Sequence, residues 1–173
     1  MNLKTYIERA EDFPKPGIVF RDVSPLLSQP DVLAHVVDTI AARWKGSVDV
    51  VAALDARGFL FGTPVSCALR LPFVMIRKKG KLPGKTLAHT YALEYGTDTI
   101  EMKPSLVPQG ARVLVIDDLL ATGGTAAAAC ALIEASGGRV AGCAFVVELD
   151  GLNGRSKLAP HDIQSLTVFS DKE

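Results

Sequence analysis

The sequence predicts an α/β protein built on a doubly wound, mostly parallel sheet. Residues 113–116 are apolar without alternation, which is typical of a strand buried on both faces, and the valine-rich residues 48–54 are predicted to form a second such strand. Residues 59–71 and the alanine-rich residues 126–135 follow these strands and are predicted to be helices. Strands that alternate with helices favour parallel pairing through right-handed crossovers.

The first 45 residues are predicted to hold two helices on either side of an irregular segment. Residues 3–10 are expected to form a short amphipathic helix, and the prolines that begin at Pro14 break regular structure up to Pro25. Residues 31–45 carry apolar side chains at helical spacing, with Asp31 as the expected N-cap.

Three further strands are predicted, at residues 73–76, 139–147 and 164–169. Between the first two of them, residues 77–87 form a basic loop that contains glycine and proline, and residues 91–94 and 99–102 are expected to pair as a small hairpin. Residues 77–102 therefore interrupt the alternation of strands and helices. Such an excursion in a compact α/β domain is more often a lid or a binding loop than idle chain.

The composition indicates one globular domain, residues 1–173, in the cytoplasm. The 19 basic and 19 acidic residues balance, so no overall field attracts nucleic acid or an anionic membrane. No stretch reaches the roughly 20 apolar residues of a membrane span, and the first nine residues lack the apolar core of a signal peptide. Three isolated cysteines and three scattered histidines favour buried free thiols over a disulfide or a zinc site.

Residues 113–125 combine the features of a site for a ribose phosphate. Asp117 and Asp118 follow the predicted strand, and the sequence Thr-Gly-Gly-Thr at residues 122–125 opens the next helix. The glycines let backbone N–H groups close on phosphate oxygens, while the helix N-terminus adds partial positive charge. Carboxylates repel phosphate but accept hydrogen bonds from vicinal hydroxyls, or bind a hydrated divalent cation. A ligand that carries a phosphate next to a diol is a ribose phosphate.

The alternative for this segment is an ordinary strand–turn–helix connection with an aspartate near the helix N-cap. Two acids ahead of a threonine-flanked glycine pair favour the ligand site instead. Residues 115–125 resemble the phosphoribosyl pyrophosphate (PRPP) motif of the type I phosphoribosyltransferases, and their ending, Leu-Leu-Ala-Thr-Gly-Gly-Thr, resembles the adenine branch of that family. The motif is neither a Walker A loop nor a dinucleotide-binding fingerprint.

The resemblance assigns roles along this motif. Asp117 and Asp118 are expected to hold the ribose hydroxyls, and Leu119 is expected to contact adenine. The 5′-phosphate is expected to bind to Ala121, Thr122, Gly123, Gly124 and Thr125.

A second candidate loop follows the predicted strand that ends at Leu54. Its sequence, Asp-Ala-Arg-Gly-Phe at residues 55–59, places Arg57 beside a glycine, where a guanidinium has room to bind a diphosphate. The alternative is a surface ion pair between Asp55 and Arg57, which contributes little to stability. The loop is similar to the second loop of the same family, which favours pyrophosphate binding and a catalytic role for Arg57.

Residues 77–85 carry five basic residues and no acid. Most such runs are solvated loops, and a nucleic-acid surface would add interleaved aromatic residues that are missing here. In an enzyme that binds a diphosphate, a mobile basic loop screens the leaving group and excludes water. Arg77, Lys78 and Lys81 are therefore expected to contact pyrophosphate.

The sequence Leu-Glu-Tyr-Gly at residues 93–96 also resembles the adenine branch. The resemblance implies that Glu94 is the acid/base near the purine and that Tyr95 is an aromatic residue of the lid. His89 and Lys85 depart from the residues expected of relatives. The motif Gly-Arg-Ser-Lys-Leu at residues 154–158 resembles the family as well, but no chemistry is assigned to it.

Residues 13–25 resemble the family's adenine-binding segment, part of a small N-terminal hood that we place at residues 1–30. Backbone groups of Val19 and Arg21 are expected to bind the edge of adenine, and Phe20 is expected to stack on the base. The alternative is a rigid turn whose aromatic residues only fill the core.

Taken together, these motifs imply the type I phosphoribosyltransferase fold with a small hood and a flexible basic lid, residues 77–102. The implied reaction joins adenine to PRPP and gives AMP and pyrophosphate. The implied cofactor is Mg²⁺, held mainly by the diphosphate and not directly by protein side chains, and the family's usual assembly is a homodimer. Two alternatives stay open: a transferase for another 6-substituted purine, and a PRPP-sensing regulator that does not catalyse.

Overall fold

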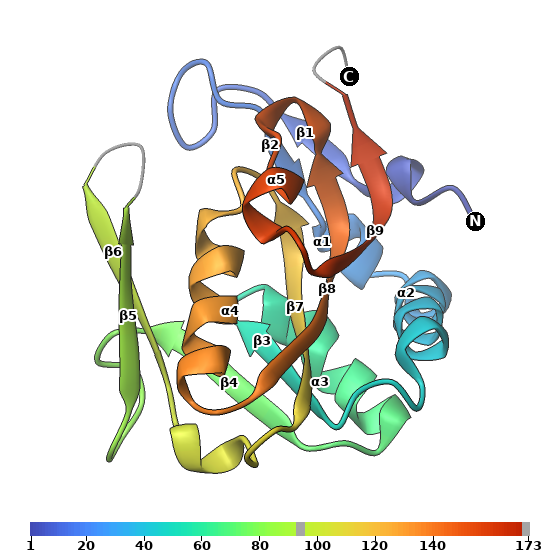
Figure 1. Ribbon diagram of the computed structural model, residues 1–173. Coiled ribbons are helices and arrows are strands. Elements are labelled where there is room, and N and C mark those ends of the chain that lie inside the picture. The colour runs from blue at the N-terminus through green and yellow to red at the C-terminus, as the bar shows by residue number, and fades with distance from the viewer. Residues whose placement is uncertain (93–95, 171–173) are drawn as a thin grey trace.

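A single mixed sheet organises the computed structural model, which describes residues 1–92 and 96–170 (Figure 1). In this part of the chain the sheet has the strand order β5-β6-β4-β3-β7-β8-β9. Five neighbouring strands are parallel, and the two at one edge are antiparallel. The strands are β3 (Val50–Leu54), β4 (Phe73–Lys78), β5 (Leu87–Ala92), β6 (Thr97–Met102), β7 (Arg112–Leu120), β8 (Arg139–Leu149) and β9 (Asp162–Phe169).

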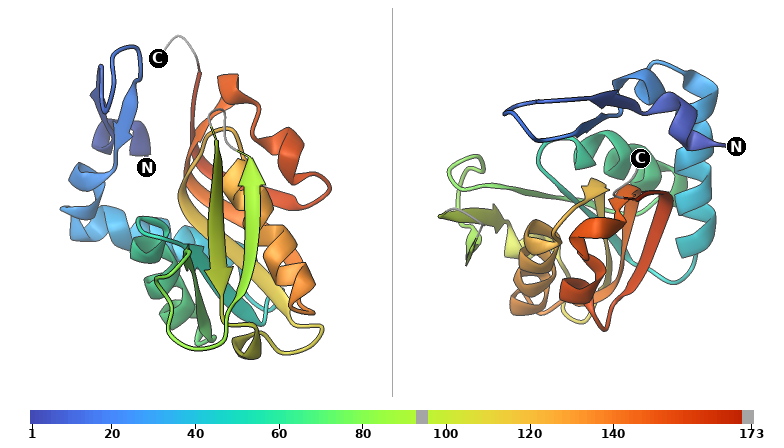
Figure 2. Two further views of the ribbon diagram at one scale, coloured as in Figure 1. Left: turned by 90° about the vertical axis from the view of Figure 1, so that its left-hand side faces the viewer. Right: turned by 90° about the horizontal axis from the view of Figure 1, so that it is seen from above.

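Helices cover both faces of the parallel strands, as Figures 1 and 2 show. On one face, α2 (Pro30–Trp44) and α3 (Gly58–Leu69) bury side chains such as Ile40 and Phe61 against the sheet. On the other face, α4 (Gly124–Ala135) buries its alanines and Ile133. The predicted doubly wound, mostly parallel sheet is therefore confirmed, although Gln29 and not Asp31 is the N-cap of α2.

The direction of winding reverses between β3 and β7. From β3 the chain passes through α3 to β4 on one side, and from β7 it passes through α4 to β8 on the other side. The loops after β3 and β7 therefore diverge and leave a crevice at the carboxyl edge of the sheet, where open α/β sheets bind ligands. One candidate motif, residues 55–59, follows β3, and the other, residues 117–125, spans the end of β7 and the loop after it.

Strand β7 is longer than predicted. It runs from Arg112 to Leu120, so Asp117 and Asp118 lie within the strand and do not follow its end. The reason is β8, which pairs with β7 as far as Leu120 and Glu148 and supplies backbone partners beyond the acids. Pairing with a long neighbour has therefore overridden the low strand propensity of aspartate.

The hood begins with a short two-stranded sheet, and the helix predicted for residues 3–10 is wrong. A 3₁₀ helix, η1 (Leu3–Tyr6), is followed by β1 (Glu8–Ala10), which pairs antiparallel with β2 (Phe20–Asp22), and a helix of one turn, α1 (Ser24–Leu27), comes next. Strand β1 is only three residues long and depends on a partner ten residues away. Sequence periodicity cannot detect so short a pairing.

The hairpin predicted in residues 77–102 is confirmed, with different bounds. Strands β5 and β6 pair from Leu87 with Met102 to Ala92 with Thr97. Strand β4 extends to Lys78, so the basic loop is shorter than predicted. Residues 93 and 94, which were expected to belong to the first strand, lie outside the described residues.

Three short elements complete the chain: η2 (Pro104–Leu106), η3 (Asp150–Leu152) and α5 (Arg155–Leu158). None of the helices in residues 1–92 and 96–170 has the length and apolar character needed to cross a membrane.

Candidate active site

Two adjoining hollows lie at the carboxyl ends of β3 and β7. The larger, about 360 Å³, is lined by residues of the β3–α3 loop, of the hairpin and of β7. The smaller, about 80 Å³, is lined by residues 119–126 at the start of α4 together with Asp117. Asp117 and Thr125 line both hollows, so one ligand can extend from the first into the second.

The smaller hollow has the properties of a phosphate site. Gly123 has φ of 76° and is the N-cap of α4, so the chain turns in the left-handed region immediately before the helix. The first N–H groups of α4 have no partner within the helix and carry its partial positive charge. A Cβ on Gly124 would meet no atom closer than 3.9 Å, which leaves room for an anion beside the backbone.

A second segment, residues 150–158, supports this loop from behind. A Cβ on Gly123 would lie 2.5 Å from the carbonyl oxygen of Gly154, and a Cβ on Gly154 would overlap the carbonyl oxygen of Ala121. The two backbones are therefore in direct contact, and both positions require glycine. The sequence alone gives Gly154 no role, because a contact between positions 31 residues apart leaves no local signal.

A partly buried ion pair holds the supporting segment in place. Arg155 donates from Nε and Nη2 to the two carboxylate oxygens of Glu148 on β8, over 2.7 and 2.8 Å. Arg155 also lies 3.3 Å from the hydroxyl of Ser165 on β9. The Glu148 side chain is only 5 % exposed. Such bidentate pairs fix geometry as well as adding energy, so Glu148 anchors α5 to the sheet.

We expect Glu148→Gln to lower the free energy of unfolding by about 2 kcal/mol at pH 7, since charge-assisted hydrogen bonds are lost. Burial disfavours the charged form of Glu148, but hydrogen bonds from Arg155 and Ser165 outweigh it and lower the pKa below its usual 4.5. A lowered folded-state pKa gives stability that is complete above the unfolded pKa and is lost as the pH falls through the folded value.

Urea unfolding at pH 7 and pH 3 measures this effect. The difference between wild type and Glu148→Gln should shrink at pH 3, and a difference that does not depend on pH contradicts an ionic origin. Glu134→Gln serves as the control, because Glu134 is exposed on α4 and its Oε1 lies as far as 3.9 Å from Nε2 of His161. It should leave the stability within about 0.5 kcal/mol of wild type.

The fold brings Asp117 and Asp118 together with Arg57. The side chain of Asp118 is 5 % exposed, and its Oδ2 lies 2.9 Å from Nε of Arg57. The N–H is not aligned with that oxygen, so Oδ2 accepts no hydrogen bond from the described residues. The backbone N–H of Asp118 donates to Oδ1 of Asp117 over 2.9 Å. The two carboxylates therefore form a coupled pair with one cation beside it.

The environment opposes the double charge of this pair. Burial raises the pKa of Asp117 well above its usual value, and the neighbouring charge of Asp118 raises it further. Burial also raises the pKa of Asp118, although the positive charge of Arg57 opposes that rise. Such a pair is stabilised by a ligand that brings hydrogen-bond donors or positive charge.

Arg57 connects three parts of the site. It precedes α3, forms the ion pair with Asp118, and places its Cζ 4.8 Å from the ring centroid of Phe20 in the hood. The alternative surface pair between Asp55 and Arg57 is not the arrangement found, since Asp55 accepts a hydrogen bond from Arg77. The next residue, Gly58, is confined: a Cβ there would lie 2.9 Å from Oδ1 of Asp117.

The three basic candidates of the lid occupy different positions. Lys78 lines the larger hollow and lies 3.1 Å from Oδ2 of Asp98. Arg77 is hydrogen-bonded to Asp55, and neither it nor Lys81 lines that hollow. Across residues 1–92 and 96–170, no group of three or more His, Cys, Asp or Glu side chains is arranged to hold a metal ion.

The four adenine candidates do not line a single hollow. Val19 and Arg21 line one of about 300 Å³ beside Phe169, Phe20 lines another of about 470 Å³, and Leu119 lines the phosphate hollow. The guanidinium of Arg21 is buried and stacks 4.0 Å from the ring centroid of Phe169. Glu94 and Tyr95 lie outside the described residues.

One contact between the hairpin and the phosphate loop was not predicted. The hydroxyl of Tyr91 on β5 lies 3.1 Å from Oγ1 of Thr125 on α4, and both residues line the larger hollow. This hydrogen bond ties the hairpin to the start of α4. Tyr91 sits beside the Leu-Glu-Tyr-Gly motif, and that proximity was the available signal.

Comparison with known proteins identifies the class to which this fold and site belong. A family model described as the phosphoribosyl transferase domain matches residues 23–173. The chain therefore belongs to the phosphoribosyl transferase family.

Within this family the similarity is to adenine phosphoribosyltransferases. The chain is 48% identical to that of Koribacter versatilis over 169 residues, 97% of this chain and 93% of the relative. It is 52% identical to that of Sorangium cellulosum over 169 residues, 97% of this chain and 84% of the relative. The predicted resemblance to the adenine branch is thereby confirmed.

Solved structures agree with the fold. The crystal structure of adenine phosphoribosyltransferase from Thermoanaerobacter pseudethanolicus matches with a TM-score of 0.93 and 45% identity, over 96% of this chain and 98% of that one. The enzyme from Saccharomyces cerevisiae, complexed with D-2,5-dideoxy-2,5-imino-altritol 1,6-bisphosphate and adenine, matches with a TM-score of 0.88 and 38% identity, over 95% of each chain.

Proposed function

We propose that this protein is a pentosyltransferase of purine salvage that transfers the 5-phosphoribosyl group from PRPP to adenine and gives AMP and pyrophosphate. The assignment of PRPP as the donor rests on the two hollows that share Asp117 and Thr125. One hollow lies against backbone amides, and the other lies beside Arg57 and Lys78. The assignment of adenine as the acceptor rests on sequence identity of 45% or more to adenine phosphoribosyltransferases over nearly the whole chain.

The donor has a natural orientation across the two hollows. Its 5′-phosphate binds in the smaller hollow, to Ala121, Thr122, Gly123, Gly124 and Thr125 at the N-terminus of α4. Its ribose hydroxyls donate to Asp117 and Asp118, which relieves the unfavourable double charge of the pair. Its diphosphate then extends into the larger hollow, towards Arg57 and Lys78.

Catalysis on this site consists of positioning and charge stabilisation. The bond from C1′ to the pyrophosphate oxygen breaks with its electron pair on the leaving group, and N9 of adenine attacks C1′. The ribose carries positive charge in this transition state, and Asp117 and Asp118 lie where that charge develops. Glu94 accepts the proton that N9 loses, and Arg57, with Arg77, Lys78 and Lys81, stabilises pyrophosphate.

Mg²⁺, when bound, screens the charge of the diphosphate. We expect that the ion would be held mainly through oxygens of PRPP, while Asp117 and Asp118 accept hydrogen bonds from the ribose hydroxyls. The carboxylates of Asp117 and Asp118 are thus compatible with a Mg²⁺ ion that enters the site together with PRPP.

Adenine binds between the hood and β7 in this proposal. Backbone groups of Val19 and Arg21, beside and within β2, are expected to bind the edge of the base. A backbone carbonyl accepts from the 6-amino group of adenine, and a 6-oxo purine would need a donor there. Phe20 and Leu119 supply apolar contacts, and Tyr95 covers the base as part of the lid, residues 77–102.

The assembly and the location stay predictions. A homodimer, the cytoplasm as location, and small molecules in place of nucleic acid or membrane as partners are what the sequence leads us to expect.

Initial rates with PRPP and four bases test the assignment. Adenine should have the highest kcat/KM, well above hypoxanthine, guanine and xanthine. A higher value for any of those three would support the alternative transferase. No release of pyrophosphate with any base, together with binding of nucleic acid, would support the regulator.

A further inference from the structure

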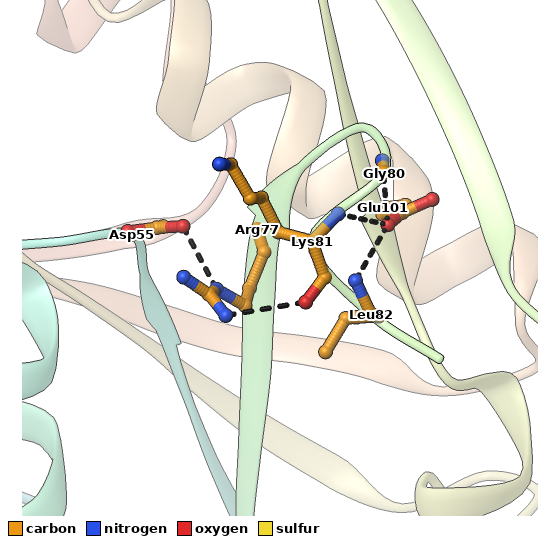
Figure 3. A network of polar contacts seen from close by, with 6 residues as sticks. All are labelled: Asp55, Arg77, Gly80, Lys81, Leu82 and Glu101. Atoms are coloured by element: carbon orange, nitrogen blue, oxygen red, sulfur yellow. Dashed lines mark hydrogen bonds and ion pairs between the residues drawn. The ribbon is translucent and has the colours of Figure 1, made fainter. Parts of the chain in front are cut away.

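Glu101 is a buried acid of the hairpin with no role in the proposed reaction. It lies on β6 and is 5 % exposed. Figure 3 shows its carboxylate facing the turn of the basic loop, where Oε1 accepts the backbone N–H groups of Gly80, Lys81 and Leu82 over 3.0, 3.1 and 3.0 Å. Its Oε2 lies 3.1 Å from the hydroxyl of Thr86, further along the loop. One carboxylate therefore binds four donors of residues 80–86.

The peptide groups at Lys81 are held from a second direction as well. The carbonyl oxygen of Lys81 accepts a hydrogen bond from Nη1 of Arg77 over 3.2 Å, and Nε of Arg77 donates to Oδ2 of Asp55 over 2.8 Å (Figure 3). Asp55 begins the loop that contains Arg57. The N–H of Lys81 is thus fixed by Glu101, and its C=O is fixed by the arginine that binds the β3–α3 loop.

The charge of Glu101 is what makes this arrangement stable. Burial favours the neutral acid, but the donors from Leu82, Thr86, Gly80 and Lys81 outweigh it and keep the pKa below its usual value. Three N–H groups converging on one oxygen need a full negative charge, because their partial positive charges repel one another. A glutamine keeps the shape but offers a neutral oxygen and an NH₂ group that accepts nothing.

We propose that Glu101 is a positioning residue that holds the basic loop, residues 79–86, in one conformation and so directs Lys81 to the diphosphate of the donor. The inference rests on the proposed function, in which Lys81 helps to stabilise the leaving pyrophosphate. The side chain of Lys81 leaves the loop on the side away from Glu101 (Figure 3), so the carboxylate acts on the backbone while the ammonium group stays available.

The test is a double-mutant cycle with Glu101→Gln and Lys81→Ala, measured as kcat and KM for each substrate. Each single variant should raise the KM for PRPP on the order of tenfold and leave the KM for adenine within about twofold, since a misplaced binding group weakens only its own substrate. The double variant should be no worse than the worse single variant. Additive effects, or equal losses for both substrates, would overturn the proposal.

A second readout does not depend on activity. Amide hydrogen exchange of Gly80, Lys81 and Leu82 without substrate should be faster in Glu101→Gln than in wild type. Failure of the proposed function would show as wild type inactive with adenine and PRPP, whereas failure of this inference would show as unchanged exchange, or as faster exchange with an unchanged KM for PRPP.

Two further variants guard against a simple loss of folding. Thr86→Val removes only the hydroxyl donor to Oε2 of Glu101 and should raise the KM for PRPP about twofold to threefold. In the Lys81→Ala background the same substitution should have no further effect on this KM. Glu134→Gln is the matched control on the exposed surface of α4 and should leave both KM values unchanged.

Discussion

Asp118→Asn is expected to lower kcat/KM for PRPP by about 10²–10³-fold while the protein stays folded. The substitution keeps the shape of the side chain but removes a negative charge that stands beside Arg57 and, in the proposed reaction, beside the positive charge that develops on the ribose. Loss of one preorganised electrostatic partner typically has an effect of that size. Initial rates of AMP formation at varied PRPP measure it.

The matched control is Asp49→Asn at the opposite end of the same strands. Asp49 accepts hydrogen bonds from the N–H, Nε and Nη2 of Arg112, and those bonds lower its pKa to about 2. Its loss should reduce stability slightly and leave kcat/KM within twofold. If Asp118→Asn were as active as Asp49→Asn, the assignment of Asp118 to the reacting ribose would be wrong.

Gly154→Ala is expected to lower kcat/KM for PRPP at least 100-fold, although residue 154 lies behind the site. A Cβ there would overlap the carbonyl oxygen of Ala121 and lie 3.1 Å from the amide nitrogen of Gly123. The supporting segment cannot retreat, because Arg155 is bound to Glu148. The phosphate loop must therefore move, and displacements of about 1 Å can reduce rates 10²-fold.

Steady-state kinetics and thermal unfolding of Gly154→Ala and Gly110→Ala separate displacement from general strain. Gly110 has φ of 74°, and a Cβ there would have no atom within 4 Å. The control should therefore lose about 1 kcal/mol of stability from backbone strain and keep its KM for PRPP. Normal kinetics in Gly154→Ala would contradict the support that we assign to residues 150–158.

The sheet and the two candidate loops at its carboxyl edge could be predicted from the sequence because both leave local signals. Apolar runs mark buried strands, and an acid pair followed by glycines marks a phosphate loop within a dozen residues. The site of Arg57 was predictable for the same reason, because strand β3 and its loop are continuous in sequence.

Contacts between distant residues could not be predicted. Glu101 looks like an ordinary polar residue of a hairpin, and only the fold places its carboxylate under the loop at residues 80–86. Gly154 and Gly123 meet because α5 packs behind α4. Strand β1 exists because β2 lies beside it, and β7 continues through its acids because β8 does.

The small sheet of the hood has a thermodynamic consequence. Two strands of three residues are at most marginally stable by themselves, so β1 and β2 depend on attachments to the body such as the stacking of Arg21 on Phe169. In the proposed function the base binds only to the attached form. Order in the hood and affinity for adenine are then reciprocally linked: adenine must slow exchange of the hood amides, and a change that loosens the attachment must weaken adenine by the factor by which it lowers the attached fraction.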